Sequence, residues 1–416
     1  MNIWSICFKN IKSKPLYTFL SIFILSLSIA LLLGVQQLKI SFKNQIENNL
    51  GKIDLVIGAK GSPLQLVLAS VLHLDNPTGN ISYNEAKKIA KNPRLKLAVP
   101  ISYGDNYKGF RIVGTTNDFN TIYNAALKEG KNVEKSMEVV IGSSVAKQLK
   151  LNIGDTFLST HGLIENNVDT HSDEFTVVGI LKPTFKVIDR LLITHLESIW
   201  DVHNHESEVH HESHHHDEHH HSEHHHEDNH DEYDDKEITS LLVTFKSPRA
   251  LLTFPRKINS TTNLQAVLPK YELHKLYNYT SIGFQTINWI AYLILAISCI
   301  TIFISLYKMV KERAFDLAIL RTYGASNFQL IQIVLYEGLC IAFLAFFIGF
   351  IFIKTLLNIL FIFMQSNYPQ NILQELPFLD VLQIGCLILV MIMISIAFAI
   401  YPILKMNISR ILSHEK

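Results

Sequence analysis

The sequence predicts an α-helical membrane protein: four transmembrane helices in a 1 + 3 arrangement, with a large α+β extracytoplasmic domain between the first and second helices. The 416 residues are 48% hydrophobic and only 18% charged, with a mean hydropathy of +0.19. Such a chain is too apolar for an ordinary soluble protein and too polar to lie wholly in a membrane. Four nearly uncharged runs reach the roughly 20 residues needed to cross a bilayer. A polar stretch long enough for a packed domain separates the first run from the second.

Basic residues near the ends of these runs predict their orientation, because cytoplasmic flanks carry an excess of lysine and arginine. The four predicted spans are residues 16–35, 287–307, 330–353 and 381–403. The basic flanks are the N-terminal segment 1–15, the connection 308–329 and the C-terminal tail 404–416. The loop 354–380 has only Lys354. We therefore expect both termini and residues 308–329 in the cytoplasm, with the domain 36–286 and the loop 354–380 outside.

The outer domain is predicted to mix strands and helices. Segments rich in β-branched residues predict strands at residues 110–115, 137–141, 175–181 and 238–245. Helices are predicted at residues 82–91 and 143–149. The first of these opens with Ser82 and has Glu85 three residues later, the pattern of a capping box. The apolar run 63–74 favours a further helix packed in the core, with a substrate-facing or membrane-dipping element as the alternative.

Composition and motifs exclude several classes of protein. The cysteines (Cys7, Cys299, Cys340 and Cys386) all lie outside the polar middle, which therefore has no disulfide framework or thiolate metal site. The zero net charge does not indicate a nucleic-acid partner. Residues 58–62 (GAKGS) lack the G-x-x-x-x-G-K-[ST] pattern of a phosphate loop. No nucleophile–base pair is recognisable, so we expect a non-enzymatic subunit without an intrinsic cofactor, and any ATP is used by another polypeptide.

Between the second and third predicted spans lies a charged segment with near-helical apolar spacing. Residues 312–326 read E-R-x-x-D-L-x-x-L-R-x-x-G-A-S. This pattern is typical of a short helix at the membrane interface, available to a soluble partner. It resembles the cytoplasmic coupling segment of FtsX/MacB-type ABC transporter permeases, although Asp316 replaces the usual Glu. The resemblance implies that a cytoplasmic ABC ATPase docks on this segment, contacting Glu312, Arg313, Phe315, Asp316, Ile319, Leu320, Arg321 and Gly324.

Two further regions resemble the same family. Residues 141–157 (IGSSVAKQLKLNIGDTF) and the following 175–182 are similar to the periplasmic core domain of MacB-type permeases. The tail from Tyr401 to Leu412 resembles the family's ending, without its usual second proline. The resemblance implies a multi-pass protein of the bacterial inner membrane. It also implies a second permease copy in a homodimer, and an outer domain that delivers mechanical work.

The segment 201–237 is rich in histidine and acidic residues. It contains fourteen histidines and fourteen acidic residues with almost no apolar side chains, which predicts a disordered insert. Imidazole and carboxylate ligands suit exchangeable Zn(II), and neutral imidazole is the ligand, so capture should fade below roughly pH 6. An incidental, solvated loop is the alternative. The candidate ligands are His210, His211, His214, His215, His216, His219, His220, His221, His224, His225, His226 and His230.

Together with the GAKGSPLQL run at residues 58–66, this insert resembles a subgroup of permeases associated with bacterial zinc acquisition. The resemblance implies zinc, or a zinc-loaded periplasmic metal-binding protein, as the cargo. Two alternatives remain open: export of lipoprotein, lipid or peptide, and a non-transporting mechanotransmitter that acts on an external partner.

Glu337 lies about seven residues into the third predicted span, where an ionised group is costly and often functional. The favoured interpretation is that its helix starts later than residue 330 and that the carboxyl reaches water near the cytoplasmic face. A functional carboxyl is the alternative.

Overall fold

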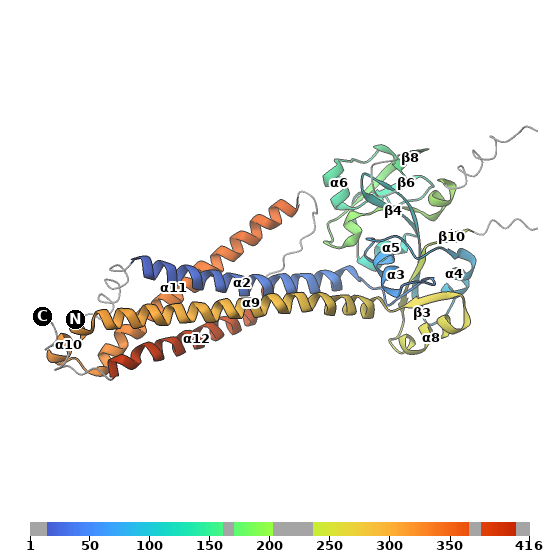
Figure 1. Cartoon of the computed structure of the whole chain (residues 1–416). Helices are drawn as coiled ribbons and strands as arrows, with labels where there is room; N and C mark the ends of the chain where they lie inside the picture. The colour runs from blue at the N-terminus through green and yellow to red at the C-terminus, as the bar shows by residue number, and fades with distance from the viewer. Residues whose placement is uncertain (1–14, 161–169, 203–235, 366–375, 405–416) are drawn as a thin grey trace, which may run out of the picture. The chain divides into compact units, whose positions relative to one another are not determined.

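The computed structural model describes residues 15–160, 170–202, 236–365 and 376–404 (Figure 1). The chain divides into two compact units. A helical unit contains the described residues up to Phe42 and from Tyr279 onward. A mixed domain contains the described residues of Lys43–Asn278.

The helical unit contains four helices that are long and apolar enough to cross a membrane, one before and three after the mixed domain in sequence. This confirms the predicted four-span, 1 + 3 architecture. Its elements are α2 (Pro15–Asn49), α9 (Pro269–Glu312), α10 (Ala314–Thr322), α11 (Asn327–Gln365) and α12 (Phe378–Leu404).

Three of these helices are longer than their apolar windows. α2 continues to Asn49 beyond the predicted end at residue 35, and α9 begins at Pro269, ahead of the predicted start at residue 287. α11 runs to Gln365, into the region predicted as a loop. Hydropathy detects only the segment that matches the bilayer, whereas a helix continues through polar residues wherever nothing stops it.

The core of the helical unit forms where α2, α9, α11 and α12 bury one apolar face each. On α2 the buried residues Leu25, Ile29 and Leu33 recur every four positions and therefore share a face. Gly349 of α11 lies against this helix, since an added Cβ there would meet the Ser26 carbonyl oxygen at 2.6 Å. Small residues permit such close approach of helices in membranes.

In the described part of the mixed domain, ten strands form one sheet and two more form a short ribbon. The strands are β1 (Leu55–Ala59), β2 (Ile81–Ser82), β3 (Leu95–Tyr107), β4 (Phe110–Thr115), β5 (Leu127–Gly130), β6 (Glu138–Ile141), β7 (Thr156–Thr160), β8 (Thr170–Leu181), β9 (Leu192–His195), β10 (Glu237–Ile238), β11 (Ser240–Phe245) and β12 (Leu264–Val267). The path of the sheet is β12-β1-β11-β3-β4-β9-β6-β8-β5, with β7 pairing with β3 and β8.

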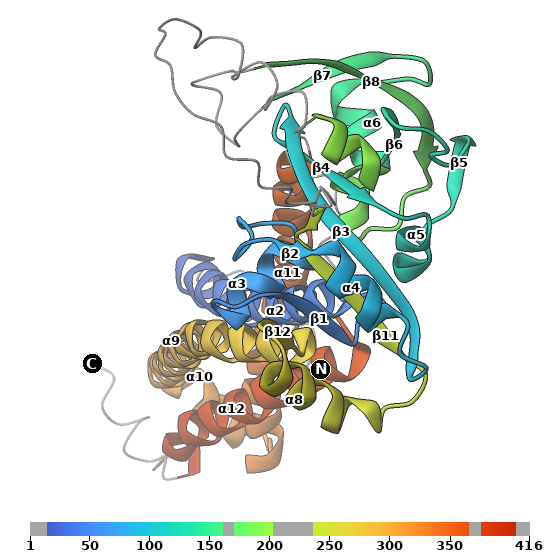
Figure 2. The same ribbon diagram turned by 90° about the vertical axis from the view of Figure 1, so that its right-hand side faces the viewer.

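The long strand β3 pairs with β11 on one side and with β4 on the other, and it therefore connects the two parts of the sheet (Figure 2). Its register with β4 shifts between Tyr103 and Asn106, and such an irregularity bends a strand. The pairs β4–β9 and β6–β8 are parallel and the others are antiparallel, so the domain is α+β as predicted.

Short helices accompany the sheet. They are α3 (Pro63–Ser70), α4 (Tyr83–Ala90), α5 (Asp118–Tyr123), α6 (Ser143–Leu149), α8 (Ala250–Thr261) and the 3-10 helix η1 (Val187–Arg190). Three of them (α3, α4 and α6) correspond to the helices predicted at residues 63–74, 82–91 and 143–149, whereas α5, α8 and η1 were not predicted. Half of the residues of α3 are buried, and Leu66 and Val67 belong to the domain core, which agrees with the favoured interpretation of residues 63–74. The prediction of a capping box at Ser82 is wrong. The Ser82 side chain makes no capping hydrogen bond, and its backbone pairs with Glu237 in the ribbon.

Candidate functional site

The predicted coupling segment folds as a short helix between two long ones. Glu312 ends α9, and Arg313 occupies the junction before α10. The residues Phe315, Asp316, Ile319, Leu320 and Arg321 lie within α10. Ala318 is fully buried and Leu320 packs against the bundle core, so α10 is fastened to the helical unit by its apolar face.

A tight turn connects α10 to α11. Gly324 has φ +94°, a conformation that favours glycine. The backbone N–H of Ala325 donates to the Leu320 carbonyl at 3.0 Å, which closes the end of α10. Ser326 and Gln329 then exchange hydrogen bonds of 3.0 and 3.3 Å between side chain and backbone, a reciprocal cap that starts α11. The Gly-Ala-Ser stop expected from the sequence is therefore a defined turn.

The most exposed apolar side chains of this region flank the turn. Tyr323 is 87% exposed and Phe328 is 67% exposed, whereas Phe315, Ile319 and Leu320 are partly covered. Phe315, Ile319 and Tyr323 follow one another at intervals of four residues, a spacing that would place Tyr323 on the apolar face of a continuous helix, and no sequence signal marked Phe328. In the structure Tyr323 lies beside the turn at Gly324 and is exposed, whereas the apolar residues within α10 are partly covered. We call Tyr323 and Phe328 the turn aromatics.

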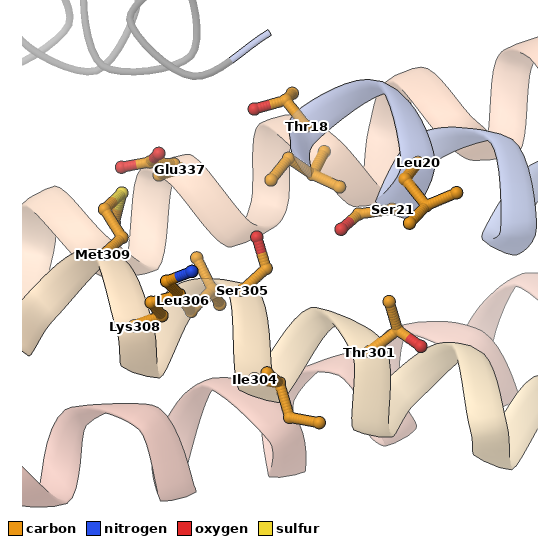
Figure 3. Close-up of a pocket in the computed structure, with 11 residues that line it drawn as sticks. Thr18, Leu20, Ser21, Thr301, Ile304, Ser305, Leu306, Lys308, Met309 and Glu337 are labelled. Carbon is orange, nitrogen blue, oxygen red and sulfur yellow. The ribbon is translucent and has the colours of Figure 1, made fainter. Parts of the chain in front are cut away.

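The helical unit also contains a cavity of about 240 Å³, lined by residues of α2, α9 and α11 (Figure 3). Glu337 is one of these residues. The favoured expectation for this residue is wrong. Its helix starts at Asn327, earlier than predicted, and Glu337 is only 3% exposed. A carboxyl in such a place is expensive to bury and is a functional-site candidate by default. Sequence reasoning did not identify Ser21 and Ser305, which share the cavity, because serines in apolar helices are common and give no signal alone.

At its far end, α2 is fastened to the outer domain by hydrogen bonds from two loops. The side-chain oxygen of Asn49 accepts from the Val187 backbone N–H at 3.0 Å. The N–H of Lys52 donates to the Ile122 carbonyl at 3.2 Å. Gly51 between them has φ +55°, and an added Cβ would lie 2.8 Å from the Ile122 carbonyl oxygen. The last residue of α2 and the turn that follows it are therefore held within the mixed domain.

The loop that receives Asn49 is itself held by a buried carboxylate. Asp189 is almost fully buried and accepts from the backbone N–H groups of Thr184 and Phe185 at 2.9 and 2.7 Å. It also accepts from the Thr184 hydroxyl at 2.8 Å. Burial raises the pKa of Asp189 above its ordinary value, although these hydrogen bonds favour the ionised form. The network holds Phe185 at φ +57°, which is strained for a bulky residue.

α9 is anchored in the same domain by its first turns. Leu273 is buried in the core that also contains Val67 and Ile122, and Leu276 packs against it. From this anchor α9 continues without interruption to Glu312, the first residue of the coupling segment. No sequence signal marked this anchor, since residues 269–286 are polar on average.

The twelve candidate histidine ligands, His210–His230, lie outside the described residues. Among the described residues, no group of three or more His, Cys, Asp or Glu side chains is placed to hold a metal ion. The ends of the insert are described, and the Trp200 indole N–H donates to the Glu237 carbonyl at 2.7 Å, 37 positions later in the chain. The described residues on either side of the insert therefore lie next to one another.

Two family models match this chain. The FtsX-like permease C-terminal model matches residues 288–408, and the MacB-like periplasmic core domain model matches residues 18–247. The periplasmic region of MacB from Actinobacillus actinomycetemcomitans is 11% identical with a TM-score of 0.34, and the match covers 55% of this chain and 95% of that one. The extracellular domain of the noncanonic ABC-type transporter YknZ from Gram-positive bacteria is 11% identical with a TM-score of 0.31, covering 52% and 98%.

These structural scores are too low to support an argument, and no curated protein matches the sequence. The family assignment therefore depends on the two sequence models, of which the MacB-like match alone spans more than half of the chain. Both models agree with the fold, since one covers the outer domain and the other covers the three C-terminal spans. The chain belongs to the FtsX/MacB-type family of ABC transporter permeases.

Proposed function

We propose that this permease couples a separate cytoplasmic ATPase to movement of its extracytoplasmic domain, in the acquisition of zinc or another divalent metal. The observation that carries the coupling is α9, a single helix of 44 residues with one end in the core of the outer domain and the other at the coupling segment. A helix transmits displacement along its axis because its backbone hydrogen bonds resist stretching and bending. Permeases of this family typically work with such an ATPase.

The turn aromatics are the surface we assign to the ATPase. Aromatic side chains dominate many protein–protein contacts because each buries a large area at a small entropic cost. Tyr323 and Phe328 are exposed beside the turn, and Glu312 adds an exposed carboxylate at the start of the segment. The buried side of α10 would pass a push on this surface into the bundle, since Ala318 and Leu320 pack there.

Co-purification of the ATPase tests this coupling surface. Replacing Tyr323 and Phe328 together by alanine should weaken association by about 30-fold or more, the effect of losing an interface hot spot. Leu252→Ala is the matched control, because Leu252 is 82% exposed on α8 of the outer domain and should leave association unchanged. Full retention of the complex by the double variant would contradict the assignment.

The proposed cargo depends on the histidine-rich segment in the sequence. Fourteen imidazoles and fourteen carboxylates within residues 201–237 form an exchangeable ligand set for Zn(II) and similar ions. Both ends of this segment are held at one place by the Trp200–Glu237 hydrogen bond. Exchange for a Gly/Ser linker of equal length should therefore leave the domain folded.

Cells with residues 203–235 replaced by such a linker should grow poorly when zinc is limiting and contain less zinc. The ATPase should still co-purify with the variant, since the coupling segment is intact. Unchanged zinc status would remove zinc acquisition and leave the coupling proposal standing, so the two parts fail separately.

A further inference from the structure

The cavity of the helical unit combines groups of opposite charge with hydroxyls. Its polar lining consists of Thr18, Ser21, Thr301, Ser305, Lys308 and Glu337. In Figure 3 the hydroxyls of Ser21 and Ser305 point into the space between α2 and α9. About 10–15 Å³ suffices for one water, so a cavity of about 240 Å³ admits a much larger group.

The cavity lies near one end of the predicted spans. Ser21 is in the second turn of the apolar run that begins at residue 16, and Ser305 is in the last turn of the run that ends at residue 307. With a rise of 1.5 Å per residue, both are within about 8 Å of the end of the apolar region. Phospholipid head groups meet the hydrocarbon at this depth.

Ser21 contributes a buried hydroxyl to the lining of the cavity. This side chain is only 2% exposed, and its hydroxyl has no hydrogen-bond partner within the described part of the chain. Thr301 in the same cavity instead donates to the carbonyl of Ile297 on its own helix, at 2.9 Å. Because a hydroxyl without a hydrogen-bond partner is unfavourable in a membrane interior, a ligand that bonds to Ser21 is favoured.

The mixture of charges selects the class of ligand. Glu337 supplies a carboxylate and Lys308 an ammonium group, with serine and threonine hydroxyls as neighbours. A metal cation is disfavoured by the lysine and by the lack of a three-ligand cluster in the described structure. An anion alone is disfavoured by the glutamate. A ligand with one positive and one negative group complements both.

The cavity also has an apolar margin. Leu20 and Ile304 line it and are exposed on the surface of the helical unit, while Ile341 is buried at its base. In a bilayer such exposed side chains face acyl chains. A ligand held here would have its polar part among Ser21, Lys308 and Glu337, with hydrocarbon available beside it.

We propose that this cavity binds the head group of an amine-bearing zwitterionic phospholipid. Lys308 and the hydroxyls take the phosphate, and Glu337 takes the ammonium group. Bound lipid would then bridge α2, α9 and α11 next to the coupling segment. The site uses none of the candidate metal ligands and neither turn aromatic, and it adjoins the ATPase surface through Lys308, whose Nζ lies 3.9 Å from a carboxylate oxygen of Glu312.

Lipid binding to the full chain in detergent, measured by native mass spectrometry, tests the proposal. The probes are palmitoyl-oleoyl phosphatidylethanolamine and phosphatidylglycerol, which have identical chains. The wild type should retain the first lipid in preference, and soluble phosphoethanolamine should displace it. Glu337→Gln should weaken retention about tenfold, because the amide keeps an acceptor oxygen but loses the negative charge that pairs with the ammonium group. Ser21→Leu should abolish it by filling the cavity.

Thr355→Leu is the matched control. Thr355 is exposed on α11 outside the cavity, and its hydroxyl donates only to Ile351 at 2.8 Å, so this variant should bind like the wild type. Equal retention of both lipids, or undiminished binding by Ser21→Leu, would overturn the proposal. If Glu337→Gln is poorly folded, Ser21→Leu decides, since leucine suits an apolar helix.

Discussion

The outer domain and the helical unit bury polar groups in different ways. In the domain, Asp189 is surrounded by donors from its own loop, and the Arg111 side chain donates to the Asp75 carbonyl at 2.7 Å. In the helical unit, Ser298 and Ser395 bond to carbonyls of their own helices at 2.8 and 3.1 Å. A loop can supply partners that a lipid-facing helix cannot. In these examples the partners of buried polar groups come from loops in the domain and from helix carbonyls among the spans.

The largest expected effect concerns the domain side of this comparison. Asp189→Ala should lower the free energy of unfolding of the outer domain by about 3 kcal/mol, because it leaves the buried N–H groups of Thr184 and Phe185 without an acceptor. Urea unfolding of the full chain in detergent, followed by Trp200 fluorescence, measures this. Asp189→Asn retains one acceptor oxygen and should lose less. An alanine variant within about 0.5 kcal/mol of wild type would show that the network is dispensable.

An intermediate effect is expected in the helical unit, where backbone approach matters more than polar partners. Gly349→Ala should destabilise the bundle by about 2 kcal/mol, because its Cβ would meet the Ser26 carbonyl oxygen at 2.6 Å. Gly385→Ala is the matched control, since its Cβ would make ordinary contact with Phe346 at 3.7 Å. The melting temperatures of the two variants are compared by thermal unfolding in detergent. Both carry Trp200→Phe, so that the tryptophan of the outer domain does not contribute to the fluorescence signal. Equal melting temperatures for the two variants would contradict the close packing of α2 and α11.

The smallest effect is a pH dependence in the domain. His73 is buried, its Nδ1 is 2.8 Å from the Tyr103 hydroxyl, and burial lowers its pKa from 6.5 to about 3. Since the pKa is lower in the folded state, the stabilisation is complete above pH 6.5 and is lost as pH falls toward 3. At pH 5.5 the free energy of unfolding should be lower than at neutral pH by about 1 kcal/mol.

His73→Asn tests this, because asparagine tolerates the φ of +54° at this position and does not titrate. The variant should be less stable at pH 7.5, having lost the ring contacts with Tyr103 and Phe119, but should show a weaker fall in stability between pH 7.5 and 5.5. An identical pH dependence in the two proteins would exclude His73 as the group responsible.

The sequence by itself determined the architecture of this permease. Four apolar runs, the polar domain between them and several elements such as residues 110–115 and 143–149 were legible, since burial in lipid and β-branched content act locally. The motif at residues 312–326 also predicted a short helix between the second and third spans, and the structure contains it as α10. These features depend on neighbours in the chain.

Only the tertiary structure decided how those parts work together. Contacts between distant residues determine the lengths of α2 and α9 and the outward position of Tyr323. The Asn49–Val187 hydrogen bond is itself such a contact. The cavity likewise needs residues 21, 305 and 337 to meet, although each is unremarkable or ambiguous alone. Hydropathy and local propensity contain no information on which buried polar groups share one space, because that is fixed by the packing of whole helices.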